Sequence, residues 1–231
     1  HASVLLVARE LEKQGHPDIG KDAGEVAGIG KLGIKLIDNI EKGIKKADCI
    51  IDFTYPEATL HHIDIALKNN VAMVIGTTGF SIQQRERLKK ASKQIQIVAA
   101  PNMSIGINLL LKVVSDMSKV LDKGYDIEIV EAHHRFKKDA PSGTAKKLAE
   151  IIAYERGIDL NKKAIYGRKG ITGEREKNTI GIHSIRGGDI VGEHTVSFIG
   201  MGERIELTHK AHSRETFARG SLLAAKFLMN A

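Results

Sequence analysis

The segment 131–145 reads EAHHRFKKDAPSGTA and gathers groups that can bind an anion and move protons. A helix that begins at Ser142 would offer free backbone N–H groups at its positive end, with Gly143 allowing close approach and Thr144 supplying a hydroxyl. A histidine or lysine nearby could pass a proton to a carboxylate-bearing substrate held there. Three basic residues would add positive charge: Arg135, Lys137 and Lys138. Alternatively, Ser142 only caps its helix and the basic residues are solvated, and the residue types leave these two interpretations equally open.

A metal site is the weaker interpretation of the same segment. His133 and His134 are adjacent, and adjacent side chains of an extended strand point to opposite faces. The two imidazoles therefore do not readily chelate one ion. We predict no metal site.

Two earlier segments place small and polar residues directly after apolar runs. The first run continues into Gly76, Thr77 and Thr78, and the second into Ala100, Pro101, Asn102 and Met103. Small residues at the carboxyl end of a buried strand let a ligand approach the backbone, and hydroxyls can bond to it. Each segment alone is equally compatible with a plain turn, but two successive ones favour a cofactor site. Near the start of the chain, Glu10 and Glu12 would suit the ribose hydroxyls of a dinucleotide, although an exposed turn would look the same.

Hydrophobic patterning indicates two kinds of domain. The first hundred residues alternate short apolar runs (4–8, 48–53, 71–78 and 95–100) with amphipathic segments, which predicts a parallel sheet with helices on both faces. From Asn102 onward the pattern changes to long helices and strands of alternating polarity. In the segment 203–212, for example, Ile205, Leu207 and His209 share one side of the expected strand. The sequence therefore predicts an α/β protein in which the parallel domain is followed by an α+β domain with a mixed, mostly open sheet.

The bulk composition narrows the functional class. The chain has 231 residues and a formal net charge of +7. Only 4% of its residues are aromatic, which leaves few stacking platforms for nucleic acid, and an anionic small molecule explains the basic excess equally well. The apolar runs are too short to span a bilayer and the first residues lack a signal-peptide pattern. We expect a cytoplasmic protein with no nucleic-acid or membrane partner.

Five motifs, taken in order, carry a resemblance to a known family: IDFTYPEATL, VIGTTGF, APNMSIGIN, EAHHRFKKDAPSGTA and GDIVGEHTVSF. Together they closely resemble the 4-hydroxy-tetrahydrodipicolinate reductase (dihydrodipicolinate reductase) family. The resemblance implies reduction of 4-hydroxy-tetrahydrodipicolinate to tetrahydrodipicolinate with loss of water, by NADH or NADPH, on the diaminopimelate route to lysine. It also implies a Rossmann-type nucleotide domain (1–103 and 214–231), a substrate and oligomerisation domain (104–213), and a homotetramer.

The resemblance assigns roles residue by residue. The proton donors correspond to His133 and Lys137. The substrate contacts correspond to His134, Ser142, Gly143 and Thr144, of which the last two bind a carboxylate. The cofactor contacts correspond to Gly76, Thr77, Thr78, Ala100, Pro101, Asn102 and Met103. Glu12 falls on the ribose-binding acid and Lys13 on a basic residue that can meet a 2'-phosphate, so the choice between NADH and NADPH stays open.

One expected part of the Rossmann-type domain is absent from the sequence. The first strand and the glycine-rich loop G-x-G-x-x-G that normally open such a domain do not precede His1. Either the sequence is a piece of a longer chain or the cofactor interpretation is wrong, and the resemblance favours the former. Two alternatives remain: a related nicotinamide dehydrogenase, which would have no reason to keep HHRFKKDAPSGTA, and a basic nucleic-acid-binding protein, which would bind DNA in a salt-dependent manner.

Overall fold

The computed structural model describes residues 10–11, 15–45, 47–121 and 123–230. The chain divides into two units, one formed by His1–Ala100 with Ser221–Ala231 and the other by Pro101–Gly220. The domain boundaries drawn from the resemblance, after 103 and before 214, stay predictions.

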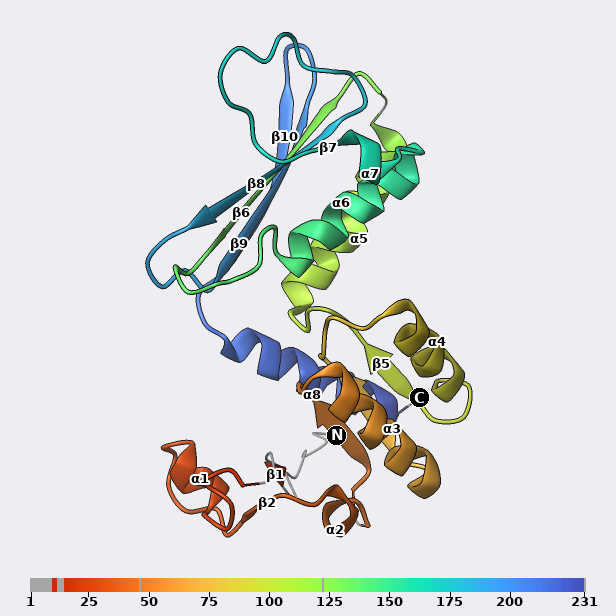
Figure 1. Cartoon of the computed structure of the whole chain (residues 1–231), viewed down its shortest axis with the longest axis vertical. Helices are drawn as coiled ribbons and strands as arrows, with labels where there is room; N and C mark the ends of the chain where they lie inside the picture. Colours follow the sequence, from red (N-terminus) through yellow and green to blue (C-terminus); the bar gives the residue numbers. More distant parts are fainter. Residues whose placement is uncertain (1–9, 12–14, 46, 122, 231) are drawn as a thin grey trace. The chain divides into compact units, whose positions relative to one another are not determined.

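The first unit has the parallel sheet that its apolar runs predict (Figure 1). Its three parallel strands, in spatial order, are β3 (Cys49–Asp52), β4 (Ala72–Ile75) and β5 (Ile97–Ala99). Its helices are α1 (Ala23–Val26), α2 (Ile40–Ile44), α3 (Pro56–Asn69) and α4 (Ile82–Ala91). A separate parallel pair is formed by β1 (Glu10–Leu11) and β2 (Leu36–Ile37). Of the three described strands, only β4 is buried along its whole length; β3 and β5 lie at the two edges of the described sheet, and Ile51 of β3 is exposed.

Local sequence explains where the two main helices of this unit begin and end. Pro56 occupies the first turn of α3, where its missing N–H costs nothing, and Asn70 ends the helix in the left-handed conformation. Ser81 and Gln84 form a reciprocal capping box at the start of α4. The two helices follow β3 and β4, whereas the short polar segments predicted to bind a cofactor follow β4 and β5.

The second unit contains the mixed sheet that the alternating strands predict. Its strands are β6 (Asp126–His133), β7 (Ala164–Ile165), β8 (Ile180–Arg186), β9 (Gly192–Ile199) and β10 (Arg204–Ala211). The spatial order is β10-β9-β6-β8-β7, with β9 antiparallel to both of its neighbours and β6, β8 and β7 mutually parallel.

Helices cover one face of this sheet (Figure 1). They are α5 (Ile105–Val120), α6 (Gly143–Arg156) and the short α7 (Leu160–Lys163). Ile127 and Ile129 of β6 pack with Val196 and Phe198 of β9 against α5 and α6. The opposite face carries alternate, more polar residues, and no helix of the described chain covers it. The last helix, α8 (Glu215–Met229), begins in the second unit and ends in the first.

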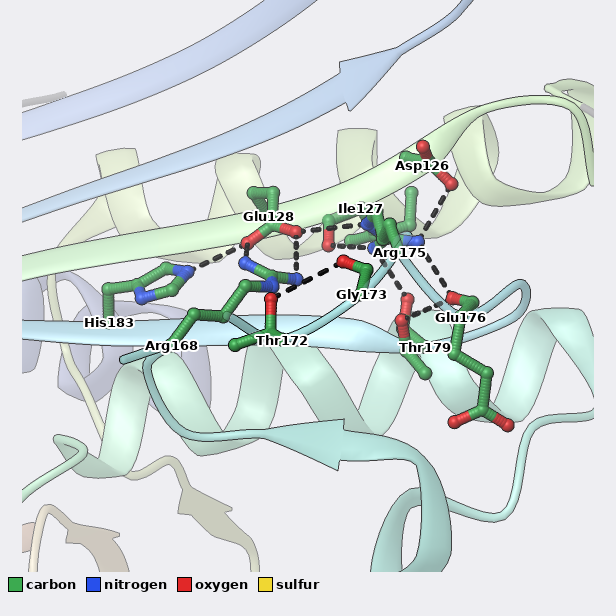
Figure 2. Close-up of polar contacts among 10 residues, drawn as sticks. All are labelled: Asp126, Ile127, Glu128, Arg168, Thr172, Gly173, Arg175, Glu176, Thr179 and His183. Atoms are coloured by element: carbon green, nitrogen blue, oxygen red, sulfur yellow. Dashed lines mark hydrogen bonds and ion pairs between the residues drawn. The ribbon is translucent and has the colours of Figure 1, made fainter. Parts of the chain in front are cut away.

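Ion pairs hold the long polar segment after α7 on the sheet (Figure 2). The Glu128 carboxylate accepts hydrogen bonds from Arg168 (2.8 Å) and Arg175 (3.2 Å), and lies 2.7 Å from His183 Nε2. Burial opposes ionisation of Glu128, but these partners outweigh it and lower its pKa to about 2. Gly181 lies opposite on β8, where a Cβ atom would overlap this carboxylate.

Candidate active site

The end of β6 and the start of α6 build the site in the second unit. Glu131 and His133 are two residues apart on β6, so both face the helix-covered side that also holds Ile129. The loop 134–141 then leads to Ser142, which caps α6. A strand end that carries a histidine and the N-terminus of a helix therefore lie close together.

Glu131 is fully buried and anchors the site. Its carboxylate accepts two hydrogen bonds from Arg186, at 2.7 and 2.8 Å, and one from the Ser142 backbone N–H at 3.1 Å. It also lies 2.5 Å from Nδ1 of His133. Burial raises the pKa of a carboxyl group, but the Arg186 bonds and the other donors outweigh this effect and lower the pKa of Glu131 to about 2. The residue is therefore an anion at neutral pH.

His133 is oriented by Glu131. Because Glu131 is ionised, Nδ1 of His133 is the donor in their contact and Nε2 is the nitrogen that gains or loses a proton. Burial lowers the pKa of His133, and Glu131 partly offsets this by favouring the imidazolium. On β9, Gly192 leaves room for the ring, since a Cβ atom there would lie 3.1 Å from Nε2.

A row of polar residues crosses the sheet beneath the starts of two helices. In register, Ser184, Glu131, His194 and His209 lie side by side on β8, β6, β9 and β10. His194 Nε2 lies 3.0 Å from Oγ of Ser142, the cap of α6, and His209 Nε2 lies 3.3 Å from Oγ of Ser104, the cap of α5. Two neighbouring strands thus each supply a histidine to a helix N-terminus.

His194 is buried and packs edge-on against His133, with ring centroids 5.2 Å apart. Burial, and secondarily the nearby His133, lower the pKa of His194 to about 4, so it is neutral at physiological pH. Burial also lowers the pKa of His209. Nδ1 of each ring is buried and has no hydrogen-bond partner within the described residues.

The start of α6 presents the groups expected of a carboxylate site. The Oγ of Ser142 accepts a hydrogen bond from the Ala145 N–H at 3.2 Å, so this serine is a true helix cap. Gly143 is exposed, and a Cβ atom there would meet nothing within 4 Å. Thr144 is buried and its hydroxyl accepts a hydrogen bond from Asn102 Nδ2 at 3.2 Å. Capping and anion binding are thus compatible, because the cap uses only one of the free donors of the helix.

In the loop 134–141, Lys137 is the least exposed of the three cations. Lys137 is largely buried, with 20% of its side chain exposed, and pairs with Asp139 at 2.8 Å. The bond from Lys137 lowers the pKa of Asp139. Arg135 and Lys138 are exposed, whereas His134 is half-buried with its ring 6.3 Å from that of Phe136. Lys137 is therefore the loop cation held beside the strand end.

The predicted cofactor residues of the first unit follow two paired strands. Ile75 of β4 lies opposite Ala99 of β5, so Gly76 and Ala100 leave the sheet side by side. A Cβ atom on Gly76 would overlap the ring of Phe53, which explains the glycine at this position. Their arrangement at the carboxyl ends of parallel strands fits the approach of a nicotinamide.

A buried network fixes the loop after β4. The Thr77 hydroxyl donates to Asp52 Oδ1 at 3.3 Å and accepts a hydrogen bond from Thr59 at 2.8 Å. Asp52 also contacts His62 at 2.8 Å. Burial opposes ionisation of Asp52, yet the bonds from His62 and Thr54 lower its pKa. The Thr77 hydroxyl is thus used inside the unit, and Thr78 is the exposed hydroxyl of this loop.

Other sequence-based expectations fall in different places. The second unit contains Pro101, Asn102 and Met103. In it, the side-chain oxygen of Asn102 accepts a hydrogen bond from the Ser104 N–H, and the Asn102 carbonyl oxygen accepts one from Asn108 Nδ2. Glu12 and Lys13 lie outside the described residues, as do the side-chain contacts of Glu10. In the part of the chain that the structure describes, no group of three or more His, Cys, Asp or Glu side chains is arranged to hold a metal ion. Every described helix is too short or too polar to cross a membrane.

Sequence reasoning missed four residues of the site: Glu131, Arg186, His194 and His209. The spacing of Glu131 and His133 on a predicted strand was a usable signal, because residues two apart share a face. The partners on β8, β9 and β10 had no such signal, since their approach depends on strand order and register.

Two family models match consecutive parts of the chain. Residues 1–103 match a model described as dihydrodipicolinate reductase, N-terminus, and residues 106–231 match dihydrodipicolinate reductase, C-terminus. Together they cover nearly the whole sequence, including both strand ends of the first unit and the whole site of the second.

Individual relatives agree with these models. A 4-hydroxy-tetrahydrodipicolinate reductase of Hahella chejuensis is 56% identical over 210 residues, which cover 91% of this chain and 79% of the relative. A 4-hydroxy-tetrahydrodipicolinate reductase of Geotalea uraniireducens is 49% identical over 225 residues, which cover 97% of this chain and 84% of the relative. The solved structure of a dipicolinate-bound dihydrodipicolinate reductase from Paenisporosarcina sp. TG-14 is 28% identical, with a TM-score of 0.72, and the match covers 97% of this chain and 84% of that one. The chain therefore belongs to the dihydrodipicolinate reductase family.

Proposed function

We propose that this protein reduces 4-hydroxy-tetrahydrodipicolinate to tetrahydrodipicolinate on the diaminopimelate route to lysine, in the cytoplasm. A hydride from NADH or NADPH and one proton are added, and one water molecule leaves. The observation that carries the proposal is the end of β6, where a titratable histidine and a largely buried lysine lie beside an open helix N-terminus. Sequence identity of about half to named reductases supports the same reaction.

His133 supplies the proton from Nε2. Its Nδ1 is held by Glu131 at 2.5 Å, which leaves Nε2 as the exchangeable position. Lys137 is the second proposed donor, and its ammonium group also stabilises negative charge that develops on the substrate. His134, half-buried at the start of the loop, is proposed to contact the substrate.

The substrate carboxylate binds at the start of α6. The backbone N–H groups of Gly143 and Thr144 point out of a fourteen-residue helix whose positive end favours an anion. The space beside Gly143 admits the ligand, and Ser142 fixes the first turn. The dipicolinate bound to the Paenisporosarcina relative is a dicarboxylate of the expected shape.

The first unit is proposed to hold the nicotinamide cofactor. Gly76, Thr77 and Thr78 would contact it after β4 and Ala100 after β5, with Pro101, Asn102 and Met103 continuing the second segment. Glu12 and Lys13 are proposed to bind the adenosine ribose. When bound, the reduced nicotinamide supplies the hydride. The chain's own contribution is the rigid loop that Asp52 and Thr59 fix through Thr77.

We also propose a homotetramer assembled through the open face of the mixed sheet. That face exposes Ile185 of β8, and Met201 in the turn between β9 and β10 is fully exposed. Analytical ultracentrifugation tests this part: a monomer at micromolar concentration would contradict it.

The substrate site is tested by thermal unfolding with and without pyridine-2,6-dicarboxylate, together with the rate of NADH and NADPH oxidation in the presence of substrate. We expect the dicarboxylate to raise the unfolding temperature of the wild type, because a ligand that binds only the folded state stabilises it. Lys137→Ala should abolish the shift and lower turnover far more than it lowers cofactor affinity. Lys147→Ala, which removes an exposed lysine further along α6, is the matched control and should keep both.

Two outcomes would contradict the proposal. A folded wild type that shows no dicarboxylate shift would mean that the loop does not bind this substrate class. Unchanged turnover in Lys137→Ala would remove Lys137 from the proton-donating site.

A further inference from the structure

Glu131 is a fully buried anion, and burial of a charge is costly unless specific partners offset it. Its partners come from three different elements: Arg186 at the end of β8, His133 at the end of β6, and the N–H of Ser142 at the start of α6. A well-packed apolar residue at this position would serve the core at least as well. The buried carboxylate therefore has a purpose beyond packing.

The first consequence concerns the orientation of His133. The 2.5 Å contact fixes Nδ1 as the protonated nitrogen and holds the ring against His194, with Nε2 beside Gly192. A carboxylate that holds one imidazole nitrogen sets both the tautomer and the basicity of the other.

The second consequence concerns Arg186. Its guanidinium contacts both Glu131 oxygens, at 2.8 and 2.7 Å, so the negative charge is shared between Arg186 and His133. The same guanidinium donates to the Asp139 carbonyl at 2.8 Å and so holds the loop that carries Lys137.

The charged and titratable groups around His133 come from each element packed against it. They are Glu131 on β6, Arg186 on β8, His194 on β9, and Lys137, itself paired with Asp139, in the loop before α6. Glu131 favours the imidazolium, whereas Lys137 and Arg186 disfavour it. Glu131 and Arg186 thus act on His133 with opposite signs.

We propose that Glu131 and Arg186 are paired positioning residues for the proton donor: Glu131 orients His133 with Nε2 free, and Arg186 limits how strongly Glu131 holds the proton on the ring. The inference rests on the proposed function for the role of His133 as donor. Neither residue touches the reacting atoms in this scheme. Their substitution should therefore move the protonation of His133 in opposite directions.

The test compares Glu131→Gln, Arg186→Met and Arg186→Lys in the full protein. The protonation midpoint of His133 is read directly from deuterium exchange at its imidazole C2 position by mass spectrometry, and the pH dependence of kcat is measured in parallel. Glu131→Gln should lower the midpoint by about one pH unit, and Arg186→Met should raise it by about half a unit. Arg186→Lys keeps the charge and should stay near the wild type. Arg168→Met, which removes the same charge beside Glu128, is the matched control and should not move His133.

The direction in which the pH profile of kcat should shift follows from the role of His133 as an acid. A donor must be protonated, so kcat falls as the pH rises through its pKa. The fall should move to lower pH in Glu131→Gln and to higher pH in Arg186→Met.

Shifts in the same direction, or none, in the two variants would overturn the inference. If Glu131→Gln does not fold, the two Arg186 variants still test the inference. A His133 midpoint that is raised in Arg186→Met and unchanged in Arg186→Lys supports the inference, and equal midpoints in the two variants overturn it. If exchange shows the opposite shifts but kcat does not follow them, the positioning role stands and the assignment of His133 as proton donor fails.

Discussion

Mild acid should weaken folding through His194, and the size of the effect can be worked out from its environment. The side chain is 3% exposed, and its pKa is about 4 in the folded protein against 6.5 for an ordinary histidine. Below pH 6.5, His194 is therefore protonated in the unfolded chain, whereas in the folded protein it stays neutral down to about pH 4. Stability is lost as the pH falls through this window, and between pH 7 and pH 5 the loss is about 2 kcal/mol.

Urea unfolding at pH 7, 6 and 5 measures this loss. Wild type and His194→Gln are compared at one protein concentration, because assembly would make the unfolding free energy concentration-dependent. Glutamine keeps an amide that can meet Ser142 Oγ but does not titrate. We expect the wild type to lose about 2 kcal/mol more than the variant over this range. Contributions of the other histidines cancel in the comparison, so parallel curves for the two proteins would refute the reasoning.

Two further substitutions test a packing contact at Gly220 and the hydrogen bonds of Glu128. Gly220→Ala should lower the unfolding temperature, because the new Cβ atom would overlap the Met103 carbonyl oxygen. This overlap should outweigh the helix preference of alanine over glycine, which is up to about 1 kcal/mol. Gly143→Ala is the control and should not lower the unfolding temperature, because its Cβ atom meets no other atom. A stabilised Gly220→Ala would show that the carbonyl moves freely. Glu128→Gln should release the segment 166–179 by weakening its bonds to two arginines, so trypsin should cleave the segment about tenfold faster. An unchanged cleavage rate would mean that other contacts hold it.

Much of the fold could be predicted because its signals are local. A proline in the first turn of α3, a serine cap on α4 and a glycine after α6 mark helix ends within a few residues. Burial on both faces was predicted for four strands of the first unit; the run 4–8 lies outside the described residues, and of the other three strands only β4 is fully buried. Continuous apolar runs do not distinguish a central strand from an edge strand, because that distinction depends on which neighbours pair with it.

The site could be predicted only where neighbouring residues along the chain build it. The cap at Ser142 and the open position at Gly143 follow from their place before a helix. By contrast, the pairing of Arg186 with Glu131 requires β8 to lie parallel beside β6 in one register. Thr77 shows a related limit: its hydroxyl bonds to a buried aspartate 25 residues earlier, a contact that its position after an apolar run does not indicate.

The Glu131–Arg186 pair and the Glu128 cluster differ in whether the stability of the fold explains their charges. The core of the second unit is an apolar cluster that includes residues of β6, β9, α5 and α6, and a buried ion pair adds little net stability to such a core. Glu131 on β6 and Arg186 at the end of β8 nevertheless form an ion pair where an aliphatic pair would pack without a desolvation cost. Their position next to His133, at the point where the strand leaves the core, is best explained by control of a proton. Among the described residues, the Glu128 cluster contacts no proposed donor and holds a loop, whereas the Glu131–Arg186 pair contacts His133 and is proposed to control its proton.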